Sequence, residues 1–562
     1  MGLEGGSSTY YLDNFERILA AVGERYGDLL TAGEQAFADD LRALTLGARC
    51  LYVRLISRRG PYFRRDDLRY DEIDDVGTAI GELAAAAFLD PEPAAAPEEL
   101  LPHLVRAEIE AIARGLGVRG PRRTKADVML ALASACDPGA VSAAIRARVP
   151  LVRLLRVDHA TLYRLLFFGN LRQDWSELVL SDLGVFRYER YFLSRHQRLY
   201  PTRAAIDDAL AIRSLGAEAR RRLEAGDGRG AFAVAAAIAR RDPPWEETAR
   251  PVADGILLEV ARPLERAGSF ADALELYGAA ASPPARERRA RLLSRVGRER
   301  AALALCREIA QAPRDESERL FAARFEHRVR RGLGQVPPAR RRYRAARRLT
   351  LQPEPGRAVE DLVLAHLAAA GRAGFHSENW LWLTLYGLAL WDVVFAPVAG
   401  AFEHAYQDGP LDLYDPAFRP RREERIAARL AEIANGAWPA SRLLALWHAK
   451  RGTRNRLVPW WPELPARLEL ALGHLAGAHL VTVLDRLSRD LGRYGRGLPD
   501  LFVVAPGAPG FVLYEVKSPG DRLRPEQIGW LDYLAASAVP CAVLAVEWSS
   551  NTGARFAAVE ST

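Results

Sequence analysis

The sequence predicts a multidomain protein whose first two thirds are mainly α-helical and whose C-terminal part is an α/β domain. Its 562 residues exceed the roughly 100 to 200 residues of a typical domain several-fold, so several domains are expected. Over long N-terminal stretches apolar residues recur at three- and four-residue steps, which is typical of helices. Near the C-terminus two short runs rich in aromatic and β-branched residues flank a Pro/Gly turn, which indicates a β-hairpin.

The predicted hairpin gathers charged residues at one end. Its strands are Leu501–Ala505 and Phe511–Lys517, and Asp500 stands immediately before the first strand. Because side chains alternate along a strand, Glu515 and Lys517 point to the same face, whose other residues are apolar. A carboxylate at the head of one strand therefore converges with a Glu-x-Lys motif at the end of its neighbour.

These residues suit metal-dependent hydrolysis of a phosphodiester. Mg²⁺ prefers oxygen ligands, which the carboxylates of Asp500 and Glu515 and the carbonyl of Val516 can supply. Metal acidifies a bound water, and Lys517 can orient that water and offset charge developing on phosphorus. The alternative is a surface Asp in a turn and a Glu/Lys pair on an edge strand. The ordered set of Pro-Asp, hairpin and Glu-Val-Lys favours the metal site and is the pattern of PD-(D/E)xK nucleases.

A helix is predicted directly after the hairpin. Pro525 suits a first helical position, and Trp530, Leu531 and Leu534 recur at helical spacing. Gln527 in the first turn faces the strand ends and is a candidate catalytic residue, with a solvated helix position as the alternative. The segments GLPDL, YEVKSPGDRL and EQIGWL resemble the VRR-NUC branch of the PD-(D/E)xK superfamily. Within that branch the chain resembles the Fanconi-associated nuclease and its bacterial relatives, which implies a restriction-endonuclease-like fold.

Composition favours a polyanionic partner in a reducing compartment. The net charge is +7 and the isoelectric point is near 9.3. The cysteines are far apart, which excludes a zinc ribbon and a disulfide scaffold: Cys50, Cys136, Cys306 and Cys541. No apolar run reaches the roughly 20 residues of a membrane span, and no signal segment opens the chain. We therefore expect a cytoplasmic protein with no membrane, and the resemblance implies a bacterial one that works at the nucleoid.

Residues 1–90 are predicted to form a helical DNA-binding domain. Arginines alternate with aromatic residues between positions 50 and 68, and such a surface can neutralise phosphates and stack on bases. The alternative is a solvated basic face whose aromatic residues lie in the core. The same segment resembles the N-terminal domain of the family. The candidate DNA contacts are Arg54, Arg58, Arg59, Arg64 and Arg65.

Residues 98–135 read as a helix, a glycine-rich loop and a second helix. Thr124, with Asp127 three residues later, can cap the second helix. The unit resembles a SAP module, which grips duplex DNA, although an ordinary helical hairpin with a basic loop is nearly as good an interpretation. The expected phosphate contacts are Arg119, Arg122, Arg123 and Lys125.

Residues 150–350 are predicted to hold degenerate tetratricopeptide-like repeats. Gly228, Gly268 and Gly297 each precede a helix with small and apolar residues at fixed offsets, which is typical of stacked helical pairs. A scaffold role is preferred for this region. Several arginines lie between His327 and Pro353, where a solvated face and a duplex-facing strip are rival interpretations.

Residues 372–562 are predicted to form the nuclease domain. Ser377 is expected to cap a buried helix that spans 380–395, with Glu378 in its first turn. Chemistry alone makes Glu378 a partner of the helix dipole, but the resemblance of HSE and TLYGLALWDVVF to the family implies that Glu378 is a further metal ligand. His376 is interpreted as structural, and helices are expected between 414 and 496.

The resemblance implies a structure-selective DNA nuclease that uses Mg²⁺ or Mn²⁺ to cut branched DNA, such as a 5′ flap or a fork. By analogy with the family it is a 5′-flap endonuclease and 5′-to-3′ exonuclease in repair of interstrand crosslinks. One alternative is a Holliday-junction resolvase or restriction-like nuclease on the same core. Another is a non-catalytic helical-repeat scaffold that binds DNA. The oligomeric state stays open, and the sequence lacks the zinc-finger cysteines of the vertebrate relatives.

Overall fold

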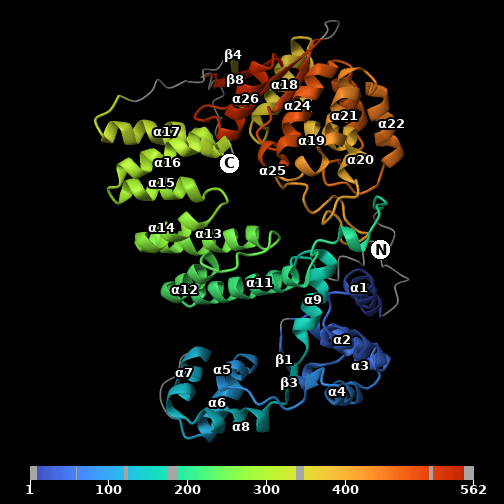
Figure 1. Cartoon of the computed structure of the whole chain (residues 1–562), viewed down its shortest axis with the longest axis vertical. Helices are drawn as coiled ribbons and strands as arrows, with labels where there is room; N and C mark the ends of the chain where they lie inside the picture. Colours follow the sequence, from blue (N-terminus) through green and yellow to red (C-terminus); the bar gives the residue numbers. More distant parts are fainter. Residues whose placement is uncertain are drawn as a thin grey trace, which may run out of the picture. The chain divides into compact units, whose positions relative to one another are not determined.

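The computed structural model describes residues 9–58, 60–118, 124–173, 187–314, 316–336, 347–505 and 510–549. The chain divides into two compact units, residues 1–186 and 187–562, and each is described by itself (Figure 1). Four predicted DNA contacts lie outside the described residues: Arg59, Arg119, Arg122 and Arg123.

The first unit opens with a helical domain built around aromatic side chains. Phe37 contacts the rings of Tyr52, Phe88, His159 and Tyr163, and all but His159 are fully buried. Such packing explains why the aromatic residues between the arginines face the core. Its elements are α1 (Tyr10–Tyr26), α2 (Ala32–Ala43), α3 (Leu46–Ile56), β1 (Tyr62–Arg64), η1 (Arg65–Asp67), α4 (Val76–Ala85) and β2 (Leu89–Asp90).

Residues after the second helical module, in β3 (Leu151–Leu154) and α9 (Val157–Phe168), pack back on the N-terminal helical domain. β3 lies between β1 and β2 and is antiparallel to both, and α9 packs on α1. Residues 150–168 therefore belong to the N-terminal unit rather than to the repeat region that the sequence predicted from residue 150. Periodicity missed this because a four-residue strand between helices acquires its identity only from its two neighbours.

The intervening module has its own apolar core. Thr124 and Asp127 form the predicted capping box at the start of α7, with Asp127 N–H donating to the Thr124 hydroxyl at 3.2 Å. Val141 and Ile145 from α8 join the same core, so the module extends beyond residue 135. Its elements are α5 (Pro97–Leu100), η2 (Leu101–His103), α6 (Arg106–Gly115), α7 (Lys125–Ala135) and α8 (Pro138–Arg148).

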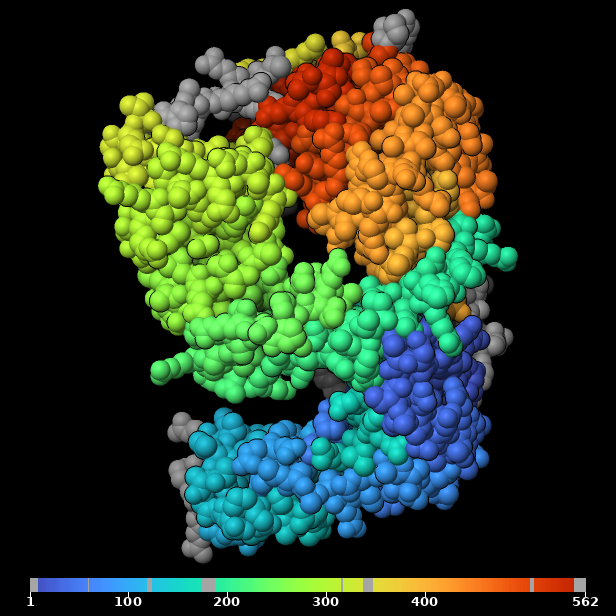
Figure 2. Space-filling model, viewed as in Figure 1, coloured from blue at the N-terminus to red at the C-terminus, as the bar shows by residue number. Residues whose placement is uncertain are grey.

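The second unit contains the predicted helical repeats, in which each helix packs on the next. Gly226, Gly268 and Gly297 adopt left-handed φ angles of 76°, 87° and 78° at the turns. The first turn residue is thus Gly226, because Gly228 already belongs to α12. In Figure 2 the repeat helices form a continuous packed surface, coloured green to yellow-green. The repeats are α11 (Arg203–Glu224), α12 (Gly228–Ala239), α13 (Arg250–Ala267), α14 (Phe270–Ala279), α15 (Ala285–Arg295), α16 (Glu299–Gln311) and α17 (Glu316–Gly332).

The predicted nuclease domain is built on a five-stranded mixed sheet in the order β4-β8-β7-β6-β5. Neighbours β5, β6 and β7 are antiparallel, whereas β8 is parallel to both β7 and β4. Its strands are β4 (Arg347–Leu351), β5 (Ala373–His376), β6 (Leu501–Val504), β7 (Phe511–Lys517) and β8 (Cys541–Trp548), and its flanking helices are α18 (Val359–Ala369) and α26 (Pro525–Ala536). The domain that contains this sheet therefore begins before residue 372, because β4 and α18 supply a strand and a covering helix.

Alternation along the strands sorts their side chains into two cores. Leu501 and Val503 contact the cluster that includes α18, whereas Phe502 and Val504 join the larger cluster that includes α26. Asp500 has the same parity as Phe502. The candidate carboxylate therefore belongs to the sheet face that α26 covers.

Helices inserted between β5 and β6 enclose that face. The predicted helix 380–395 is buried as expected but ends at Ala389, and α20 follows after Leu390. The inserted helices are α19 (Trp380–Ala389), α20 (Trp391–Val394), α21 (Glu423–Ala434), α22 (Ala440–Lys450), α23 (Leu464–Leu472), α24 (Gly477–Arg489) and α25 (Leu491–Tyr494).

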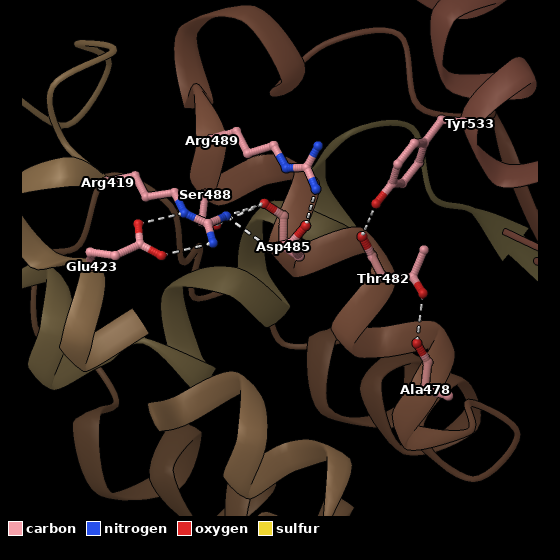
Figure 3. A network of polar contacts seen from close by, with 8 residues as sticks. All are labelled: Arg419, Glu423, Ala478, Thr482, Asp485, Ser488, Arg489 and Tyr533. Atoms are coloured by element: carbon pink, nitrogen blue, oxygen red, sulfur yellow. Dashed lines mark hydrogen bonds and ion pairs between the residues drawn. The ribbon is translucent and has the colours of Figure 1, made fainter. Parts of the chain in front are cut away.

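Polar contacts join the inserted helices to one another and, through Tyr533, to α26 (Figure 3). Arg419 donates to Glu423, to Asp485 on α24 and to the hydroxyl of Ser488. The Tyr533 hydroxyl of α26 donates to the carbonyl of Thr482 on α24 at 3.1 Å. The insertion is therefore bonded to the helix whose start borders the candidate site.

Within the described residues, no single helix is long and apolar enough to cross a membrane. By length and composition alone, one bent pair, α23 with α24, passes the same test.

Candidate metal and nuclease site

The register of the sheet brings the two predicted carboxylates together. Leu501 pairs with Tyr514, so the next position of the same antiparallel ladder sets Asp500 opposite Glu515. The Val516 N–H donates to Asp500 Oδ2 at 2.7 Å and holds that carboxylate at the strand end. The backbone of β7 thus orients the first candidate ligand.

Glu515 is a buried acid whose hydrogen-bonding capacity is largely unused. Its side chain is fully buried, and Lys517 Nζ lies 2.7 Å from Oε1. That contact is an ion pair rather than a well-aligned hydrogen bond, and Oε2 has no hydrogen-bond partner among the residues that the structure describes. A buried carboxylate with an unused oxygen is costly unless a cation completes it, and this is the donor set that a divalent metal needs.

Both carboxyl groups have raised pKa values. Burial, reinforced by the charge of Asp500 and opposed by Lys517, raises the pKa of Glu515 to about 8. Burial also raises the pKa of Asp500 to about 6, against the hydrogen bond from Val516 and the charge of Lys517. Without a bound cation the pair therefore keeps a proton at neutral pH, mainly on Glu515. A bound metal would displace that proton.

Glu378 reaches the site from β5 rather than from a helix. The Ser377 N–H donates to the Asp500 carbonyl at 2.7 Å, which extends the β5–β6 ladder past His376. One oxygen or nitrogen from each of His376, Glu378 and Asp500 lies within 4.8 Å of the other two. The sequence analysis predicted a structural role for His376, but its half-exposed ring is one of the three members of this cluster.

The predicted helix cap at Ser377 is wrong. The hydroxyl of Ser377 donates to the carbonyls of Pro499 and Asp500, and the helix starts at Trp380 after Asn379, whose φ is 53°. Glu378 therefore precedes the helix instead of lying in its first turn. The ladder to β6 competes for Ser377, and a local capping pattern does not reveal such a partner.

Gln527 sits at the first turn of α26, as predicted, but its side-chain oxygen is engaged. Its Oε1 accepts from the Arg524 N–H at 2.8 Å and caps the helix. Gly497 has a φ of 81°, and a Cβ there would lie 2.7 Å from Glu526. Only glycine allows the start of α26 to pack against the loop that leads to Asp500.

The described arginines of the N-terminal domain divide into paired and unpaired ones. Arg54 pairs with Glu72 at 2.5 Å and stacks on the ring of Tyr11, and Arg64 forms a two-pronged pair with Glu108 at 2.7 and 2.8 Å. Arg58 donates to the Tyr70 hydroxyl, Arg65 is exposed, and Lys125 donates to the Pro102 carbonyl. Within the described part of the chain, no carboxylate lies within ion-pair distance of Arg58 or Arg65.

Comparisons with known proteins match both ends of the chain. The FAN1 HTH domain family matches residues 9–90, and the VRR-NUC domain family matches residues 435–548. The Fanconi-associated nuclease 1 homolog of Pseudomonas aeruginosa is 34% identical over 96% of each chain. The Arabidopsis thaliana homolog is 26% identical over 93% of this chain and 65% of its own length. A crystal structure of paFAN1 bound to 5′ flap DNA with a two-nucleotide flap and a gap matches with a TM-score of 0.84 and 32% identity, covering 98% of this chain and all of the other.

Proposed function

The chain belongs to the Fanconi-associated nuclease 1 family, and from that membership we propose that it cuts branched DNA bearing a 5′ flap or a fork. It is a nuclease with a VRR-NUC domain, which implies dependence on a divalent metal. Mg²⁺ or Mn²⁺ is the proposed ion. The relative of known structure that it resembles over nearly its whole length is bound to 5′ flap DNA. A role in DNA repair, including repair of interstrand crosslinks, follows from the family resemblance.

One observation carries the proposal. A fully buried Glu515 lies opposite Asp500 on one sheet face, with one oxygen unpartnered and a lysine 2.7 Å from the other. A scaffold without catalysis would gain stability by replacing this pair with apolar residues. The arrangement therefore favours a working metal site over the non-catalytic alternative.

The proposed ligands are the carboxylates of Glu378, Asp500 and Glu515 and the carbonyl of Val516. When bound, a divalent cation would polarise the phosphoryl group and acidify a water. Val516 also positions Asp500 through its N–H, so one residue serves both the strand and the site. His376 lies within 4.8 Å of two of them, Glu378 and Asp500, in the structure.

Lys517 and Gln527 have supporting roles in the proposed chemistry. The Lys517 ammonium lies at the same end of β7 as Glu515, where it can hold the attacking water and stabilise negative charge on the phosphate. Gln527 fixes the start of α26 beside the site through its bond to Arg524. Both keep the reacting groups in place without accepting the water's proton.

Affinity for DNA is proposed to come from the basic surfaces of the first unit. Among the residues that the structure describes, Arg58 and Arg65 are the best candidates, because no described carboxylate lies within ion-pair distance of either. Arg54, Arg64 and Lys125 already have partners within the chain and would contact phosphate only through their remaining donors. Arg59, Arg119, Arg122 and Arg123 remain proposals from the sequence.

Digestion of end-labelled DNA tests the function. Flap, fork, four-way junction and plain duplex substrates of the same sequence are incubated with Mg²⁺, with Mn²⁺ or with EDTA. We expect cleavage near the branch of flap and fork in either metal and none in EDTA. Equal cleavage of the plain duplex would overturn branch selectivity. Two results together would favour the resolvase alternative: preferential, paired cuts of the four-way junction, and a dimeric protein as measured by light scattering.

A further inference from the structure

An aromatic surface adjoins the metal cluster. Trp380 begins α19 two residues after Glu378, and its indole N–H donates to the carbonyl of His376 at 2.9 Å. Its ring centroid also lies 5.7 Å from that of Phe375. The indole is therefore fixed to the strand end that carries His376 and Glu378.

Trp461 extends this surface outward into solvent. It lies in the loop before α23, its ring centroid is 5.5 Å from that of Trp380 at an interplanar angle of 66°, and 44% of the residue is exposed. The neighbouring Trp460 faces inward, packs on Trp391 and Trp447, and donates its indole N–H to Thr453. Trp460 therefore anchors the loop in the core, and the adjacent Trp461 stays exposed.

A cation lies near one of the two rings, that of Trp380. The guanidinium carbon of Arg467 on α23 lies 5.8 Å from the Trp380 ring centroid. Among the described residues no carboxylate is within ion-pair distance of Arg467, although Glu463 lies one helical turn before it. An exposed indole and a cation that both contact Trp380 match the two chemical features of a nucleotide, a flat base and a phosphate.

We propose that Trp461, supported by Trp380, stacks on an unpaired base next to the scissile phosphate, while Arg467 contacts a neighbouring phosphate. The inference deepens the proposed function and rests on it for the identity of the DNA. Inside a continuous duplex both faces of a base are covered by its neighbours, so a ring can stack only on a base that has left the helix or that lies at its end, as bases at a branch do. The nuclease domain itself would then sense the branch, in addition to the basic surfaces of the first unit.

Fluorescence of 2-aminopurine tests the stacking directly. The analogue is placed, one position at a time, on both sides of the branch of a flap DNA and bound to Glu515→Gln protein, which keeps the DNA intact. We expect quenching at one position beside the cleaved bond, and loss of that quenching when Trp461→Leu is added. Trp461→Phe should retain most of it because an aromatic face remains. An identical signal with and without Trp461→Leu at every position would overturn the proposal.

Cleavage of an abasic substrate separates stacking from general damage. With otherwise unmutated protein, Trp461→Leu should lower kcat/KM on the flap at least about fivefold, the lower end for one stacked base. On a flap lacking that single base, wild type and variant should be equal, since the base that the ring would cover is already missing. Phe192→Ala, which removes another exposed aromatic of the same unit, is the matched control and should change neither substrate.

The outcomes distinguish this proposal from the one it rests on. Equal losses on intact and abasic flaps would refute stacking while leaving the nuclease function in place, and would point to a protein-facing or folding role for the ring. Absence of cleavage by wild type on every DNA would refute the proposed function, yet the 2-aminopurine signal would still decide whether Trp461 holds a base.

Discussion

The nuclease site and the basic face of the N-terminal domain treat charge in opposite ways. In the nuclease domain Glu515 is fully buried beside Asp500, and one of its oxygens has no partner among the described residues. In the N-terminal domain Arg54 and Arg64 are neutralised by Glu72 and Glu108. One region holds two carboxyl groups inside the fold with a single lysine paired to Glu515, whereas the other pairs each of these arginines with its own carboxylate.

This difference indicates where an external ligand is needed. Uncompensated carboxylates in a dry site destabilise the fold, and a metal relieves that cost. An arginine with an internal partner gains little from a phosphate because it must first give up a carboxylate. Residue type therefore identifies candidates for ligand binding. Candidates without an ion-pair partner inside the protein are the stronger ones.

The largest expected effect comes from removing one carboxylate. Asp500→Ala or Glu515→Ala should lower cleavage of flap DNA by at least about 10³-fold, because several kcal/mol of metal-derived stabilisation are lost. DNA affinity should stay nearly unchanged, since it depends mainly on cationic contacts to phosphate. Single-turnover cleavage and a binding titration measure both. The control is Glu547→Ala on the neighbouring strand, which should cleave normally. Turnover retained in either site variant would refute the assignment.

Glu378→Gln should have the next largest effect. If Glu378 holds metal, cleavage should fall by about 10²-fold with little change in Tm, because the residue is exposed and precedes the helix. A role limited to favouring the helix dipole would cost no more than about 1 kcal/mol of stability and leave activity intact. A folded, fully active variant would therefore remove Glu378 from the site.

The basic face offers a comparison between paired and unpaired arginines. Replacing Arg58 and Arg65 with alanine should weaken flap binding and reduce the slope of log affinity against log salt by about 1 for each phosphate that is no longer neutralised. Arg64→Ala is the matched variant: it should lower Tm slightly because Glu108 loses the cation with which it pairs, and it should leave the slope nearly unchanged. Equal slopes for the double variant and wild type would assign the two arginines to a solvated face.

The smallest expected effect is a gain in stability. The folded protein retains the Glu515 proton up to about pH 8, whereas an unfolded chain releases it near pH 4.5, so metal-free wild type loses stability as pH rises through this window. Glu515→Gln should remove that loss, and its oxygen can still accept from Lys517. In EDTA the variant's Tm should exceed that of wild type by a few degrees at pH 8 and by little at pH 5.

Metal addition provides the complementary measurement. Mn²⁺ should raise the Tm of wild type more than that of Glu515→Gln, because the variant has lost one of the three proposed carboxylate ligands. A variant that is less stable than wild type at pH 8 in EDTA would contradict the raised pKa of Glu515.

The sequence by itself determined the hairpin, the convergence of Asp500 with Glu515 and Lys517, and the helix that starts at Pro525. These features lie within a short stretch, and strand alternation and turn chemistry are local, so order along the chain is enough to predict them. The family resemblance supplied Glu378 as a candidate ligand from a distant segment.

Only the tertiary structure decided which strands complete the sheet and which charges have partners. β4 joins the nuclease domain through β8, and Ser377 is taken up by the ladder to Asp500 instead of capping a helix. Glu72 and Glu108 neutralise arginines that composition alone made equivalent to Arg58 and Arg65. Such pairings join residues far apart in sequence, and their identity depends on the packing of whole elements. No local period records that packing, so the sequence proposes the chemistry and the fold determines which residues are available to perform it.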